Sequence, residues 1–263
     1  MPKSTDYTAK IPDDQGYIAY TSDEDSVWTD LVAAQSEAVQ THMAQPYLKG
    51  LKLLDLPTNR VPQCPDISAK LAGLTGWSVA PVPALIGFKT FFNMLAEQTF
   101  PAASFIRSRK DFDYIEEPDI FHEIYGHTPL LTDDRFARFS QAIGQAGQNA
   151  TKDQYSWLIR LYWFTIEFGL TRENGEIKAL GSGLASSPTE LPHAVLAKDV
   201  VRRPFDVLDI LRTPYRIDIH QPLYYVIDKL DDLFEALERD LLADVQTAQS
   251  KGLFTPLYPP KAA

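Results

Sequence analysis

Two histidines, His122 and His127, lie five residues apart, and Gly126 stands directly before the second. On an unbroken α-helix this spacing would point the two side chains about 140° apart, because each residue turns about 100°. We expect a helix that opens near Pro118 to end at Gly126, so that His127 lies just beyond the end and turns back toward His122. Pro129 would stop the helix from continuing. The pattern predicts two ligands of one metal ion.

A third candidate ligand is Glu167, which lies in an almost wholly apolar stretch, residues 155–170. The stretch is long enough for a buried helix, and a carboxylate within it is costly unless it is paired or binds a metal. A buried ion pair, for example with Arg160, Arg172 or a base distant in sequence, explains Glu167 equally well at this point. Two histidines and one carboxylate are the ligands of the facial triad of non-haem Fe(II) oxygenases, which leaves positions open for O2 and substrate.

Two other classes of protein could carry the same three residues. A zinc hydrolase would hold tetrahedral zinc with them and activate one water molecule. The zinc-protease motif, however, spaces its histidines four residues apart rather than five. A non-catalytic helical binding module would use the histidines and the carboxylate for structure alone. Metal analysis distinguishes these alternatives.

Arg107, Arg109 and Lys110 form a basic cluster shortly before the histidines. Such a cluster is most often a solvated loop. An arginine is also the natural partner of a substrate carboxylate, because its planar guanidinium can donate two parallel hydrogen bonds. The position of the cluster, just ahead of the candidate metal ligands, favours a substrate contact.

The composition is that of an acidic globular protein. The 263 residues are 44% hydrophobic, enough for one sizeable core, and the net charge of −10 argues against nucleic-acid binding. Cys64 is the single cysteine, so a reducing compartment is expected. The longest uncharged run, residues 71–88, falls short of the ~20 apolar residues of a membrane span. Residues 1–14 contain no apolar signal-peptide region, so we expect a cytoplasmic protein without a membrane segment.

The apolar spacing predicts a mainly α-helical chain with a few short β-strands. We expect an extended arm over residues 1–22 and a single domain over residues 23–263. Residues 46–64 are expected to form a loop, and Asp66 is expected to cap the helix that follows. The expected helices cover 23–45, 66–74, 85–98, 133–146, 155–170, 188–197, 205–212 and a last helix from residue 227 to about residue 246; the expected strands cover 77–83, 101–106 and 177–180.

Four segments resemble the pterin-dependent aromatic amino acid hydroxylases. Residues 116–129 (EEPDIFHEIYGHTP) and 162–170 (YWFTIEFGL) are similar to the two signatures of that family, and residues 177–187 and 221–225 match further blocks in the same order. The resemblance covers more than half of the chain, and the chain length is similar to that of the bacterial phenylalanine 4-hydroxylases. It implies a single catalytic domain of the aromatic amino acid hydroxylase type.

The resemblance implies a role for each matching residue of this chain. His122, His127 and Glu167 would be the catalytic iron ligands, and Arg107 would pair with the carboxylate of the amino acid. The remaining implied substrate contacts are Pro118, Asp119, Trp163, Phe168, Gly183 and Ser186, and the implied pterin contacts are Ile86, Phe88, Phe91 and Glu123.

The implied reaction is the hydroxylation of L-phenylalanine to L-tyrosine by O2 and a tetrahydropterin at Fe(II). The pterin would be tetrahydrobiopterin or a bacterial analogue. The enzyme is expected to act as a monomer on its small-molecule substrate, without nucleic-acid or membrane partners. Tryptophan or tyrosine hydroxylation within the same family stays open. Ile217 lies near the position where tyrosine hydroxylases carry an aspartate, and its aliphatic side chain favours phenylalanine.

Overall fold

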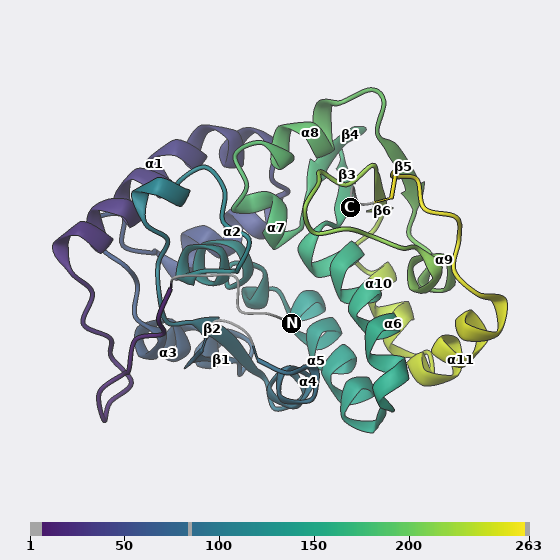
Figure 1. The fold of residues 1–263 in the computed structure, drawn as a ribbon, viewed down its shortest axis with the longest axis horizontal. Coiled ribbons are helices and arrows are strands. Elements are labelled where there is room, and N and C mark those ends of the chain that lie inside the picture. The colour runs from purple at the N-terminus through teal and green to yellow at the C-terminus, as the bar shows by residue number, and fades with distance from the viewer. Residues whose placement is uncertain (1–6, 84–85, 261–263) are drawn as a thin grey trace.

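Helices surround two small β-sheets in the computed structural model, which describes residues 7–83 and 86–260 (Figure 1). The expectation of a mainly helical chain with short strands is confirmed. Residues 121–127 contact the first sheet and residues 163–167 contact the second, so the segments with the candidate metal ligands lie between the sheets. No helix in the described part of the chain combines the length and the apolar character of a membrane span.

The N-terminal half of the chain opens with two helices. α1, Ser22–His42, confirms the first expected helix, and a reciprocal pair of hydrogen bonds between Thr21 and Glu24 caps its start. α2, Gln45–Leu54, occupies the first half of the expected loop, so the prediction was wrong for that part. Pro46 lies in the first turn of α2, where a proline costs nothing because that N–H would have no helical partner. The prolines that had favoured the loop, Pro57, Pro62 and Pro65, all lie beyond the end of α2.

α3, Cys64–Leu74, leads into the first sheet. Its N-cap is Gln63, and Asp66 lies inside the first turn, so the expected capping role of Asp66 was wrong. The carboxylate still faces the positive end of the helix dipole. Leu85, where the next helix was expected to begin, lies outside the described residues. The elements that follow agree with expectation and are β1 (Ser78–Val82), α4 (Phe88–Ala96) and β2 (Thr99–Ala103), with the two strands paired in parallel.

The second sheet has the strand order β4-β3-β6-β5, and of these strands only β4 was expected. β6, Leu223–Ile227, is buried along its whole length, and periodicity alone cannot tell such an apolar run from a helix. The expected long last helix was therefore wrong, because the chain forms β6 and then two short helices. The elements of this half are β3 (Leu170–Glu173), β4 (Glu176–Ala179), α7 (Ser182–Ala185), α8 (Glu190–Leu196), β5 (Val201–Pro204), α9 (Val207–Arg212), α10 (Asp232–Leu237) and α11 (Leu241–Lys251).

Two longer helices cross the middle of the molecule, α5, Asp134–Asn149, and α6, Lys152–Tyr162 (Figure 1). α5 starts where expected, and α4 lies directly against it. A Cβ atom added at Gly144 of α5 would lie 2.3 Å from the backbone nitrogen of Ala96. Glycine at this position therefore allows the two helix backbones to approach, which fixes α4 and the aromatic side chains it carries.

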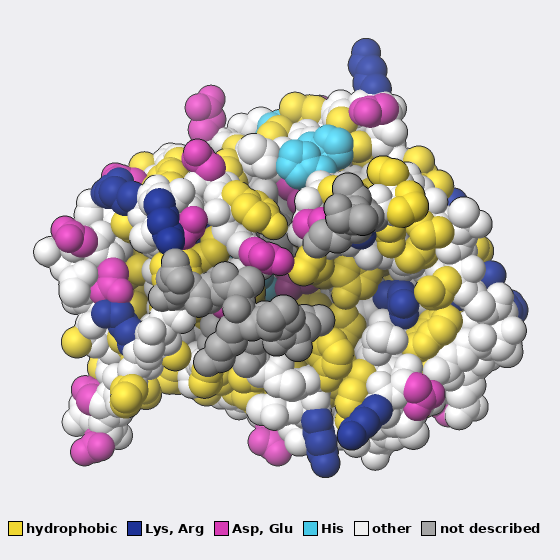
Figure 2. Space-filling view, viewed as in Figure 1, with side chains coloured by type: hydrophobic (Ala, Val, Ile, Leu, Met, Phe, Trp, Pro, Cys, Tyr) yellow, Lys and Arg dark blue, Asp and Glu magenta, His cyan; other side chains and the backbone are white. Residues whose placement is uncertain are grey.

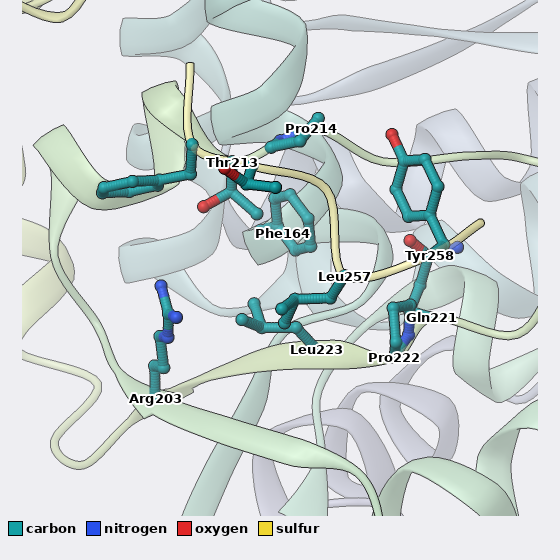
Figure 3. A pocket seen from close by; sticks show the side chains of 11 residues that line it. Phe164, Arg203, Thr213, Pro214, Gln221, Pro222, Leu223, Leu257 and Tyr258 are labelled. Carbon is teal, nitrogen blue, oxygen red and sulfur yellow. The ribbon is translucent and has the colours of Figure 1, made fainter. Parts of the chain in front are cut away.

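The segment after α11 folds back over the second sheet. The Tyr258 hydroxyl donates a hydrogen bond to the Tyr215 carbonyl at 3.2 Å. Leu257 and Tyr258 line a small cavity together with Phe164 (Figure 3). The end of the chain thus covers the loop that carries Tyr215 toward the candidate site.

Because α4 and α5 approach so closely, one methyl group added at Gly144 should lower the stability of the fold clearly. We expect Gly144→Ala to lower the free energy of unfolding by about 1–3 kcal/mol, because the backbone of Ala96 cannot move away cheaply. Gly73→Ala in α3 is the matched control, since an added Cβ there meets nothing within 4 Å, and it should be neutral or stabilising by up to about 1 kcal/mol. Urea unfolding of the three proteins measures both effects, and equal losses would contradict this account of the packing.

Candidate active site

The two histidines lie on one π-helical segment, Phe121–His127. The expectation that the helix ends at Gly126 was wrong, because Thr128 and Pro129 also keep helical backbone angles. A π-helix closes i to i+5 hydrogen bonds, so residues five apart stack one turn above the other. The wider π-helical turn therefore brings His122 and His127 to the same side, which the helix end had been expected to do.

Glu167 also lies in a π-helical turn, Trp163–Glu167, which continues α6. The Phe168 N–H donates to the Trp163 carbonyl at 2.8 Å, the i to i+5 pattern. The helix expected to reach residue 170 therefore ends at Glu167. A Cβ atom at Gly181 would lie 2.0 Å from the Glu167 carbonyl oxygen, so the small-residue segment after β4 packs directly on this turn.

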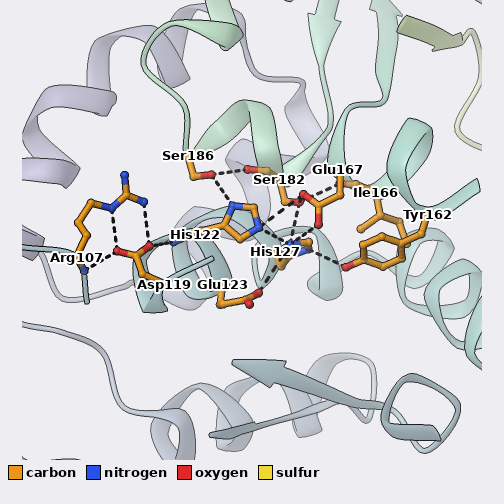
Figure 4. A network of polar contacts seen from close by, with 10 residues as sticks. All are labelled: Arg107, Asp119, His122, Glu123, His127, Tyr162, Ile166, Glu167, Ser182 and Ser186. Carbon is orange, nitrogen blue, oxygen red and sulfur yellow. Dashed lines mark hydrogen bonds and ion pairs between the residues drawn. The ribbon is translucent and has the colours of Figure 1, made fainter. Parts of the chain in front are cut away.

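The donor atoms of the three residues converge on one point (Figure 4). His122 Nε2 and His127 Nε2 are 3.1 Å apart, and the Glu167 carboxylate oxygens lie 3.1 Å from His127 Nε2 and 3.6 Å from His122 Nε2. Ligands at about 2.1 Å from one metal and at right angles are about 3.0 Å apart. The separations thus fit three ligands on one face of a metal ion.

The expected ion pair of Glu167 forms with the two histidines and not with an arginine. Arg172 pairs with Asp228 at 3.3 Å, and Arg160 donates to the Ser156 carbonyl. Neither arginine therefore explains the buried carboxylate, which faces the two imidazoles instead.

Hydrogen bonds hold both imidazoles with Nε2 toward the common point. His122 Nδ1 lies 2.8 Å from the Ser186 hydroxyl, and His127 Nδ1 lies 3.3 Å from the Tyr162 hydroxyl. The Ser182 hydroxyl contacts Glu167 Oε2 at 3.0 Å. Such contacts to the second ring nitrogen fix the orientation of metal-binding histidines. The sequence had suggested Ser186 but not Tyr162 or Ser182, although both lie inside segments that were singled out.

Glu123 is a second acid in the same site. Its Oε2 lies 3.9 Å from His127 Nε2, and His122, Glu123 and His127 each place a ligand atom within 4.8 Å of the others. Burial raises the pKa of Glu123 to about 8. Burial also acts against the charged form of Glu167, but His127 and His122 outweigh it and hold the pKa of this carboxyl well below its usual range. Glu167 is thus the charged acid near neutral pH.

The pKa values of the two histidines differ because burial and the charge of Glu167 act on them with different strength. Burial disfavours the charged form of both rings. For His122 the nearby Glu167 carboxylate outweighs burial and raises the pKa to about 9, whereas for His127 burial prevails and the pKa is lowered.

Arg107 forms a buried, two-pronged ion pair with Asp119. Its Nε and Nη2 lie 2.8 Å and 2.9 Å from the two carboxylate oxygens, and its backbone N–H donates to the same carboxylate. Asp119 also accepts a hydrogen bond from the His122 N–H at 3.1 Å. One carboxylate therefore ties the arginine to the start of the histidine segment. The basic cluster does not act as one unit, because Arg109 forms an exposed ion pair with Asp30 and lies away from the buried Arg107 pair.

A cavity of about 320 Å³ opens beside the three converging residues. Figure 2 shows the molecular face that carries its mouth. Ile217 lines the cavity, whereas Asp119 lies behind Arg107 rather than in the wall. Eight residues assigned by resemblance line it together, namely Arg107, Pro118, His122, Trp163, Glu167, Phe168, Gly183 and Ser186.

The cavity wall is built of stacked aromatic rings. Trp163 contacts Phe168 in a tilted arrangement at a centroid distance of 4.5 Å, and it stacks on Tyr215, outside the lining, at 4.4 Å. A Cβ atom at Gly183 would lie 2.8 Å from the Phe168 ring, so glycine there lets the wall close. Flat apolar surfaces with an arginine on the same cavity suit an amino acid with an aromatic side chain.

Comparisons with known proteins decide the family. Residues 3–246 match the biopterin-dependent aromatic amino acid hydroxylases. The chain belongs to this family. A phenylalanine-4-hydroxylase of Vibrio cholerae is 49% identical over 98% of this chain and 89% of its own length, and one of Pseudomonas aeruginosa is 46% identical over 99% of both chains. The apo structure of the cold active phenylalanine hydroxylase from Colwellia psychrerythraea 34H is 47% identical, with a TM-score of 0.94 over 98% of this chain and 100% of that chain.

Membership in the hydroxylase family sets aside the zinc hydrolase and the non-catalytic module. The pterin contacts stay a prediction. The aromatic cavity is not lined by any of the four residues to which the resemblance assigns them, Ile86, Phe88, Phe91 and Glu123. Phe91 meets the Tyr162 ring edge-on at 5.1 Å, and the Tyr162 hydroxyl in turn contacts a metal-ligand candidate. Phe88 is 45% exposed on the first turn of α4. A pterin on this side would approach the three converging residues from the α4 side.

The buried Arg107–Asp119 pair predicts a specific loss of stability. We expect Asp119→Asn to lower the free energy of unfolding by roughly 3–5 kcal/mol at pH 7, because the mutation leaves the guanidinium buried without its countercharge. Arg107 holds the pKa of Asp119 below its ordinary value. The stabilisation is therefore complete above about pH 4 and is lost as the pH falls through the folded-state pKa, so the gap between wild type and variant should narrow in acid.

Asp30→Asn is the matched control for this experiment. It breaks the exposed pair with Arg109, which should be worth less than about 1 kcal/mol. Urea unfolding from pH 7 to pH 3 gives both differences. A gap that is small at pH 7, or that widens in acid, would contradict the role of the buried pair.

Proposed function

We propose that the chain is a phenylalanine 4-hydroxylase, which converts L-phenylalanine to L-tyrosine with O2 and a tetrahydropterin at Fe(II). The proposal extends the family membership with the names of two similar relatives, which are phenylalanine-4-hydroxylases. We further propose that His122, His127 and Glu167 hold the iron.

One observation carries the proposal. Three candidate metal-ligand side chains converge beside a cavity that is lined by the aromatic side chains of Trp163 and Phe168 and by the buried Arg107. Glu167 is preferred to Glu123 as the third ligand because its oxygens lie 3.1 Å and 3.6 Å from the two imidazole nitrogens, whereas Glu123 lies 3.9 Å from the nearer one. The charged state of Glu167 agrees with this choice.

The protein's own contribution is to bind and orient the substrate. Arg107 would receive the amino acid's carboxylate, with its guanidinium held in place by Asp119. Trp163 and Phe168 would hold the ring so that its far end points toward the converging ligands. Bound iron and tetrahydropterin would supply the activation of O2. Orientation alone can lower a reaction barrier by about 7–11 kcal/mol at best, which is the upper limit for the contribution of the fixed arginine and the aromatic wall.

The reaction itself is tested by product analysis. Purified protein with ferrous ion, a tetrahydropterin and O2 should convert phenylalanine to tyrosine in a competition with tyrosine and tryptophan. Omission of the pterin, or replacement of iron by zinc, should abolish the product. Hydroxylation mainly of tyrosine or tryptophan, or turnover with zinc and no pterin, would contradict the proposed function.

A pair of matched variants distinguishes which of the two acids, Glu167 or Glu123, binds the iron. Glu167→Gln should lower bound iron at least about tenfold, because the amide is a poor ligand and brings no charge, whereas Glu123→Gln should keep the iron content near that of the wild type. Iron per chain is measured after reconstitution with ferrous ion and removal of free metal. The opposite result, loss of iron from Glu123→Gln alone, would place Glu123 in the metal shell.

We also propose that the enzyme is a cytoplasmic monomer. A reducing compartment agrees with a chain whose single cysteine, Cys64, is buried and unpaired. Light scattering of the active sample should give the mass of one chain, 29.6 kDa, and twice that mass would contradict a monomer.

A further inference from the structure

The segment before α1 reaches the loop that carries Arg107. The Ser108 N–H donates a hydrogen bond to the Tyr7 hydroxyl oxygen at 2.8 Å. The same hydroxyl contacts the Asp111 carboxylate, and the Tyr7 ring stacks on Phe105 with a centroid distance of 4.9 Å. A residue about a hundred positions away in sequence thus holds this loop at three points.

The three contacts surround Arg107 in the sequence. Phe105 lies two residues before it, Ser108 directly after it, and Asp111 in the single 3-10 turn Arg109–Asp111. This part of the chain, between the end of β2 and the histidine segment, contains no other regular element. Its order comes from a backbone hydrogen bond between the Ile120 N–H and the Phe105 carbonyl at 2.8 Å and otherwise largely from side-chain contacts.

Arg107 is held from two directions. Asp119 fixes the guanidinium and the backbone N–H of Arg107 from the side of the metal ligands. Tyr7 fixes the residues on either side of Arg107. The hydrogen bonds of the Tyr7 hydroxyl go to Ser108 and Asp111, the neighbours of Arg107 along the loop, so we expect its effect on binding to pass through the position of the loop.

We propose that Tyr7 is a positioning residue, which sets the place of Arg107 relative to the converging ligands and so the distance available to an amino acid between them. This inference rests on the proposed function. It gives a residue of the expected N-terminal arm, Tyr7, a role in the substrate site.

The arm has other anchors that do not involve this loop. Lys10 pairs with Glu24 at 2.7 Å, and the Tyr17 hydroxyl donates to Asp66 at 3.0 Å. Loss of one hydroxyl at Tyr7 should therefore leave the arm attached. Tyr17→Phe is a matched control, because it removes a tyrosine–aspartate hydrogen bond of the same arm away from Arg107.

The experiment compares Tyr7→Phe, Tyr17→Phe and the wild type. Tyr7→Phe keeps the ring on Phe105 and removes only the hydroxyl, so the KM for L-phenylalanine should rise about threefold to tenfold while kcat stays within about twofold. The inhibition constant of phenethylamine, which lacks the carboxylate, should not change. Tyr17→Phe should match the wild type. Asp111→Asn, which alters the other partner of the hydroxyl, should raise KM in the same direction.

Hydrogen exchange provides a readout that does not depend on turnover. Peptides covering residues 105–112 should exchange faster in Tyr7→Phe than in the wild type or Tyr17→Phe. An unchanged KM and unchanged exchange in Tyr7→Phe would overturn the inference, as would equal effects of Tyr7→Phe and Tyr17→Phe or an equal weakening of phenethylamine. Absence of tyrosine from the wild type would instead contradict the proposed function.

Discussion

The structure depends on the meeting of two imidazoles and one carboxylate inside a largely apolar core. Each group alone would be costly to bury, and together the charge of Glu167 and the nitrogens of His122 and His127 offset that cost. A metal ion would complete the same set. The two π-helical turns follow from this requirement, since each widens a helix at the point where a ligand must face inward.

The substrate site is coupled to this meeting point through one carboxylate. Asp119 accepts hydrogen bonds from the side chain and backbone of Arg107 and from the backbone of His122. The distance between the arginine and the three converging side chains is therefore fixed by buried, charge-assisted hydrogen bonds. The aromatic wall between them is equally constrained, because Gly183 allows Phe168 to close against Trp163.

The sequence predicted the chemistry of the site better than its local geometry. His122, His127 and Glu167 were found from residue type and neighbourhood, and the structure brings them together. The π-helical turn was not predicted, because a helix end and a wider turn both bring residues five apart together and the sequence does not tell them apart. β6 was missed because a strand buried on both faces lacks alternation. Tyr162 and Ser182 were missed because their contacts join segments distant in sequence.

The central claim, that Glu167 and the two histidines share one iron ion, is tested most directly by diffraction at the iron absorption edge from crystals loaded with ferrous ion. The account predicts a single anomalous peak about 2 Å from His122 Nε2, His127 Nε2 and a Glu167 carboxylate oxygen, with the remaining positions facing the aromatic cavity. A peak bound by Glu123 in place of Glu167, or a peak that contacts only one histidine, would contradict it.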